Sequence, residues 1–207
     1  MRRLLVLLAL AAPLLSAQAR IDFIKKFPGS TPPYFHLWVD AAGKGEYRES
    51  PDDDQPFPLR LSPEETSAVF DLARRLGHFS TPLESGLKVA FTGEKTLRFT
   101  DGETRHETTF NYTANPDGQK LLDWMERIAE TARHAINLER TAQFDRLGLD
   151  RALLEVQYAY EQKRLAGASQ LLPILDRIAR NKSAFNRVRE RAATLAEAIR
   201  SGKPPSP

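Results

Sequence analysis

The residues best suited to chemistry stand at alternate positions in one short stretch. Tyr34, His36 and Trp38 are separated by single residues, so in an extended strand they would share one face. Their side chains offer aromatic surfaces, an imidazole that can exchange a proton, and hydrogen-bond donors. We therefore take this face as the candidate ligand-binding site, for a peptide, a glycan or a partner protein.

The residues between them favour a simpler interpretation. Phe35, Leu37 and Val39 would occupy the opposite face, so the strand is apolar or aromatic on both sides and is expected to be buried on both. Metal binding by His36 has little support, because no second ligand stands at strand or helix spacing. We expect neither a metal nor another cofactor.

The other titratable groups carry weaker signals. Asp52-Asp53-Asp54 lacks the alternate ligand spacing and the glycine turn of a calcium loop, so a solvated loop is expected. His78 should interact with the last carbonyls of a helix, and His106 should point inward from its strand. His134 should lie at the surface or at a domain junction.

The sequence contains no Gly-x-Ser-x-Gly nucleophile elbow. It also contains no cysteine, which excludes thiol catalysis and cysteine-ligated metal. We expect a non-enzymatic protein-interaction or binding module, with another exported protein as the partner. Two alternatives stay open: a secreted hydrolase without a recognisable motif, because sequence does not reveal a triad, and a small-ligand carrier with a cavity between sheet and helix.

The N-terminus predicts export. Arg2-Arg3 precede an apolar run from Leu4 to Leu15, and Ala17-Gln18-Ala19 matches the small-x-small cleavage pattern. Residues 1–19 are thus expected to be a signal peptide cleaved after Ala19, giving a periplasmic or secreted product. The short signal and the helices rich in Ala, Leu and Arg indicate a bacterium.

The charge balance argues against polyanionic partners. The chain has 30 basic and 27 acidic residues, and removing Arg2 and Arg3 leaves 28 against 27, a net charge of +1. This gives no reason to expect nucleic acid or, after cleavage, a membrane as a partner.

Hydrophobic spacing predicts the elements that must position these residues. After an irregular lead-in over 20–33, we expect an α+β domain over 34–130, with a small antiparallel sheet covered on one face by helices. Its strands are expected at 34–39, 46–49, 87–91, 95–100 and 105–112, with residues 50–58 as a loop. A capping box at Ser62-Pro63-Glu64-Glu65 begins a helix.

The chain is organised around the stretch from Asn115 to Gly148. Asn115-Pro116-Asp117 predicts a helix start, and no glycine or proline follows from Gln119 to Leu147. Gly148 is expected to stop this helix in the left-handed conformation. Its length of about 45 Å exceeds the small sheet, so its second half should pack on a helical-hairpin tail over 131–200. Residues 201–207 are expected to be disordered.

Two segments show resemblances. The run from Phe144 to Leu154, with the helices after it, resembles segments of exported bacterial proteins of unassigned function. The earlier layout of hairpin, Ser-Pro-Glu-Glu helix, hairpin and long helix is similar to small sheet-and-helix families of unknown function. Neither resemblance implies catalytic residues.

Overall fold

The structure, a computed structural model, describes residues 18–203. All but the last two residues of the expected signal peptide, and residues 204–207 of the expected disordered end, lie outside this range. No helix within it is both long enough and apolar enough to cross a membrane.

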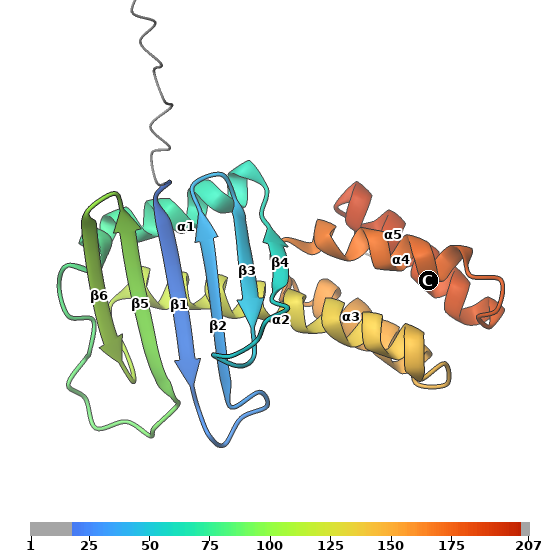
Figure 1. The fold of residues 1–207 in the computed structure, drawn as a ribbon, viewed down its shortest axis with the longest axis horizontal. Coiled ribbons are helices and arrows are strands. Elements are labelled where there is room, and N and C mark those ends of the chain that lie inside the picture. Colours follow the sequence, from blue (N-terminus) through green and yellow to red (C-terminus); the bar gives the residue numbers. More distant parts are fainter. Residues whose placement is uncertain (1–17, 204–207) are drawn as a thin grey trace, which may run out of the picture.

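Across residues 18–203, six strands form one antiparallel sheet in the order β4-β3-β2-β1-β5-β6 (Figure 1). The strands are β1 (Arg20–Lys26), β2 (Tyr34–Asp40), β3 (Lys44–Arg48), β4 (Phe57–Arg60), β5 (Glu94–Asp101) and β6 (Thr104–Phe110). The first strand of the chain is therefore central, with β2 on one side and β5 on the other.

Three expectations about the strands were wrong. The lead-in over 20–33 begins with β1, because Ile21 and Phe23 alternate into the core. The expected strand 87–91 is a loop with exposed apolar side chains, since β1 already occupies the edge of β5 that it would pair with. The expected loop over 50–58 ends in the edge strand β4, where Pro58 is tolerated.

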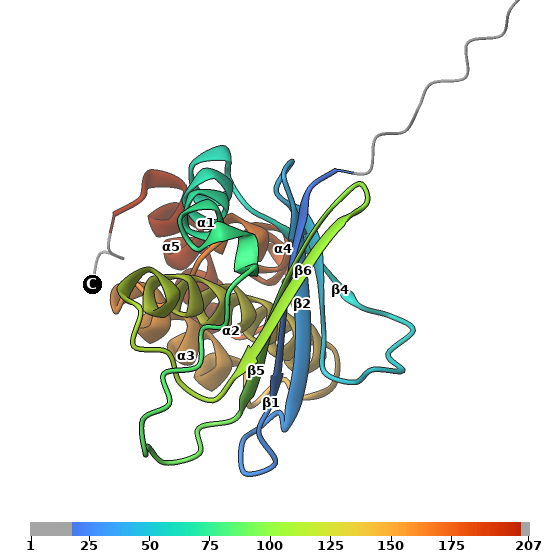
Figure 2. The ribbon, with the colours of Figure 1, turned by 90° about the vertical axis from the view of Figure 1, so that its left-hand side faces the viewer.

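The helices complete an α+β architecture, as the sequence predicted. They are α1 (Pro63–Arg75), α2 (Pro116–Phe144), α3 (Leu149–Glu161), α4 (Leu172–Arg180) and α5 (Asn186–Ser201), with short 3-10 turns η1 (Gly77–Phe79) and η2 (Ala168–Leu171). Figure 2 shows α1 and α2 on the same side of the sheet. The capping box at Ser62 and the cap at Asn115 are both formed.

Helix α2 contributes to two hydrophobic cores. Its first half, from Leu121 to Ala132, packs with the sheet and α1. Its second half supplies Ala135 and Leu138 to a separate cluster with the C-terminal helices. The length of the helix predicted this sharing between the two cores, and the prediction is confirmed.

The ends of two helices differ from expectation. Gly148 has a φ of −73° and precedes α3 instead of closing α2 in the left-handed region. Helix α2 ends at Phe144 with Asp145 as its C-cap, and Oδ1 of Asp145 accepts a hydrogen bond from the Gly148 N–H. At the other end of the tail, α5 continues through Ser201, inside the segment expected to be disordered.

Candidate functional site

One face of the sheet carries the candidate site. On β2, Phe35, Leu37 and Val39 point into the core and are buried, whereas the alternate positions are half-buried on the opposite face. No helix of residues 18–203 covers that opposite face (Figure 2). The expectation of a strand buried on both faces therefore does not hold, and Tyr34, His36 and Trp38 lie on an open surface.

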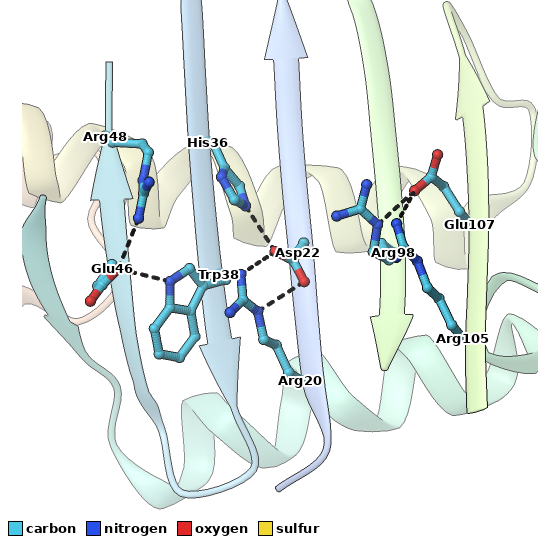
Figure 3. Close-up of polar contacts among 9 residues, drawn as sticks. All are labelled: Arg20, Asp22, His36, Trp38, Glu46, Arg48, Arg98, Arg105 and Glu107. Atoms are coloured by element: carbon cyan, nitrogen blue, oxygen red, sulfur yellow. Dashed lines mark hydrogen bonds and ion pairs between the residues drawn. The ribbon is translucent and has the colours of Figure 1, made fainter. Parts of the chain in front are cut away.

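The strand register places five side chains in a line across this face. Trp38 of β2 lies opposite Glu46 of β3 and Asp22 of β1. Asp22 lies opposite Arg98 of β5, which in turn lies opposite Glu107 of β6. We call this line the cross-sheet row (Figure 3). Side chains at this spacing are close enough to interact across strands. Their hydrogen bonds and ion pairs form two groups, one around Asp22 and Trp38 and one around Glu107.

Asp22 is the buried centre of the row, with a side chain only 3% exposed. Its Oδ1 lies 2.8 Å from Nε2 of His36, and its Oδ2 accepts from Nε of Arg20 at 3.0 Å. Burial would raise the pKa of Asp22, but the hydrogen bonds and the charges of His36 and Arg20 outweigh it and hold that pKa below its usual range. The carboxylate thus stays ionised, and His36 Nε2 is the donor.

Trp38 is held from two sides. Its Nε1 donates to Oε2 of Glu46 at 3.1 Å, and the Arg20 guanidinium lies 4.3 Å from the centre of its ring system. Arg48 Nη2 donates to the same Glu46 oxygen at 3.0 Å. These contacts hold the indole in one orientation. The part of the ring that they leave uncovered is an apolar surface beside charged groups.

The far end of the row is a second cluster of charge. Arg98 Nε donates to Oε2 of Glu107 at 2.6 Å, and Arg105 lies 3.8 Å from the same oxygen. Four arginines (Arg20, Arg48, Arg98 and Arg105) contact three carboxylates (Asp22, Glu46 and Glu107) in the two groups of Figure 3. The network carries a net charge of +1 when His36 is neutral.

The other histidines lie outside this network. His78 has a positive φ of 52° and stacks on Phe99 at 4.2 Å between ring centres, in place of the expected contact with helix carbonyls. His106 has the expected inward parity, and its buried Nδ1 finds no hydrogen-bond partner in the described part of the chain. His134 lies 3.8 Å from Glu130. Within 18–203, no group of three metal-ligating side chains occurs.

Sequence reasoning found one strand of the site and missed the rest. Arg20 and Asp22 were assigned to an irregular segment, although Ile21 and Phe23 alternate around Asp22 in a way typical of a strand. Arg98 lies in the expected strand 95–100, but its place beside Asp22 follows only from the pairing of β1 with β5. Ser85 and Lys88 have the Ser-x-x-Lys spacing, but they lie in the loop before β5.

The arrangement combines groups suited to binding with one pair of residues that also occurs in catalytic sites. Asp22 and His36 resemble the orienting half of a hydrolytic triad, yet within 18–203 no serine or threonine hydroxyl is hydrogen-bonded to His36. The face instead offers a fixed aromatic plate and guanidinium groups with N–H donors beyond those engaged. No family model and no curated protein matches the chain, so the geometry of this face alone carries the functional argument.

Proposed function

We propose that this chain is an exported, non-enzymatic binding module that recognises a segment of another exported protein on the open face of its sheet. The observation that carries this proposal is the buried, charge-paired network that holds Trp38 in place on an uncovered surface. A sheet face that only contacts solvent does not require an aspartate at its centre whose side chain is 3% exposed.

The chemistry of the face defines the partner. Tryptophan and arginine dominate the energetics of protein interfaces because they combine apolar area with directional donors. The guanidinium groups of Arg20, Arg48 and Arg98 favour carboxylates. The expected partner therefore presents acidic side chains next to an aromatic or apolar one that covers the Trp38 ring.

The alternative of a small-ligand carrier loses its support. The space between the sheet and α2 is filled by side chains that are fully buried, among them Phe23, Leu97 and Met125. Native protein cores hold few voids larger than a water molecule. A cavity there would need these side chains to move.

Photo-crosslinking tests the proposal. Ile24 lies on the same open face, opposite His36 and Thr96, so a photoreactive amino acid placed at position 24 should capture the partner from the exported fraction of the source cells. The matched control places it at Ser67, which is exposed on α1. We expect an adduct from position 24 that disappears when Trp38→Ala or Arg98→Gln is added.

Two results would contradict this function. Equal adducts from positions 24 and 67, or an adduct that survives both added substitutions, would show that the open face does not select a partner. Turnover of an ester, peptide or glycoside panel that His36→Ala abolishes would replace the binding module by the hydrolase alternative, with Asp22 and His36 as its orienting pair.

A further inference from the structure

Two turns meet at the end of the helical tail farthest from the sheet (Figure 1). The turn between α2 and α3 carries Phe144 and Leu147, whose exposed fractions are 75% and 83%. The turn between α4 and α5 carries Phe185, which is 63% exposed. A hydrogen bond from Arg146 to the Ser183 carbonyl joins the two turns, so the three apolar side chains belong to one protruding end.

This end also carries a net positive charge. We define the tail tip as residues 144–151 and 180–187, which hold five basic and two acidic residues, a net charge of +3. The rest of 18–203 then has 23 basic and 25 acidic residues, a net charge of −2. Both acids of the tip have partners: Asp145 accepts from Gly148, and Asp150 pairs with Arg187 and Arg191.

We propose that the tail tip docks on an anionic membrane surface. Apolar side chains on a protruding end enter the interface between headgroups and acyl chains, while neighbouring cations stay among the headgroups. The overall charge of +1 gave no reason to expect a membrane, but it conceals this separation of charge. The concentration of cations beside exposed Phe and Leu is the evidence for an anionic bilayer.

The size of the tip argues against a protein in this position. A stable protein interface buries about 800 Å² on each partner, which three protruding side chains on two short turns do not supply. A bilayer needs no complementary surface. Docking by the tip would leave the open sheet face free (Figure 1), so the inference does not depend on the function proposed for that face.

The absence of cysteine allows a direct test. Leu147→Cys introduces a unique thiol for an environment-sensitive fluorophore, and Leu87→Cys, at a position 59% exposed in the loop before β5, is the matched control. Protein is recovered from the exported fraction and its N-terminus determined, because an uncleaved leader would itself bind vesicles. With vesicles of phosphatidylglycerol and phosphatidylcholine, we expect increased, blue-shifted emission at position 147 and little change at position 87.

Vesicle sedimentation measures the contribution of the side chains. The triple variant Phe144→Ser, Leu147→Ser and Phe185→Ser should lower partitioning at least tenfold, whereas the control triple Leu87→Ser, Val89→Ser and Phe91→Ser should leave it unchanged. Lys182→Gln with Arg187→Gln should weaken binding and reduce its dependence on salt.

Three outcomes would overturn the proposal: equal partitioning of the two triple variants, equal binding to neutral and anionic vesicles, or an emission change at position 147 that follows protein concentration without vesicles. The last would identify a second copy of the chain as the occupant. If the triple variant of the tail tip failed to fold, the fluorescence changes at positions 147 and 87 would still test whether the tip contacts the bilayer.

Discussion

The buried carboxylate at the centre of the sheet face gives the sharpest test of the structure. Asp22→Asn keeps the size of the side chain and removes its charge. His36 Nε2 then faces an amide that can donate as well as accept, and Arg20 loses its ionic partner. The expected result is a protein that folds with the same sheet and has a lower free energy of unfolding.

The magnitude follows from the exposure of the two partners. The hydrogen bond from His36, whose side chain is 16% exposed, belongs to the charge-assisted class and is worth about 1.5–3 kcal/mol. The Arg20 side chain is 37% exposed, so solvent screening limits its contribution to about 0.5 kcal/mol. We expect Asp22→Asn to cost about 2–3 kcal/mol, or roughly 5–10 °C in Tm for a chain of this length.

The pH dependence has a definite sign. Because folding lowers the pKa of Asp22, the stabilisation is fully present above the unfolded-state pKa of about 4. It is lost as the pH falls through the lower pKa of the folded state. The difference in stability between wild type and Asp22→Asn should therefore be largest near neutral pH and shrink below about pH 4.

Urea unfolding followed by circular dichroism measures both effects. The matched control is Asp123→Asn, since Asp123 is 67% exposed and pairs with Arg127 only across the helix surface. That change should cost less than about 0.5 kcal/mol. A loss of unfolding free energy in Asp22→Asn no larger than in the control at neutral pH, or a loss that grows in acid, would contradict a stabilising charged Asp22.

Other changes test the core. A Cβ at Gly45 would lie 1.9 Å from the Trp38 carbonyl oxygen, so Gly45→Ala should cost at least about 2 kcal/mol by urea unfolding; a neutral effect would contradict the β2–β3 pairing. Burial and the Glu49 carboxylate raise the pKa of the Tyr47 phenol far above its usual range, so the fold loses stability as pH rises above about 10. Tyr47→Phe should flatten that alkaline loss in pH-dependent melting. Leu138→Ala should lower the free energy of unfolding by about 2–5 kcal/mol. The unfolding midpoint measured by tryptophan fluorescence, which reports the sheet half, should fall together with the midpoint measured by circular dichroism. A lower midpoint in circular dichroism alone would show that the two cores unfold separately.

Local signals in the sequence predicted the helices well. The capping box at Ser62 and the Asn115-Pro116 start lie within a few residues of the backbone groups they satisfy, so spacing alone identifies them. The length of α2 then required a second partner beyond the sheet. Since a helix satisfies its hydrogen bonds internally, little information from distant residues was needed.

The strands depended on distant partners, and there sequence reasoning failed. Apolar and polar residues alternate over 87–91 as in a strand, but β1 occupies the edge of β5 with which this segment would pair. For β1, the prolines and the glycine that follow it favoured the interpretation as an irregular segment. For the candidate site, too, local patterns indicated only the residues of one strand. Its β2 residues follow from local alternation, while Asp22 and Arg98 reach them only through a register that the sequence does not state.

The central position of β1 has a consequence for how the chain folds during synthesis. Arg20 is among the first described residues to emerge, yet its β5 neighbour Thr100 follows about 80 residues later. Until then β1 has only the hairpin with β2, and a lone hairpin is marginally stable in water. The sheet must therefore close late through a long-range encounter, which makes folding slow relative to helix formation.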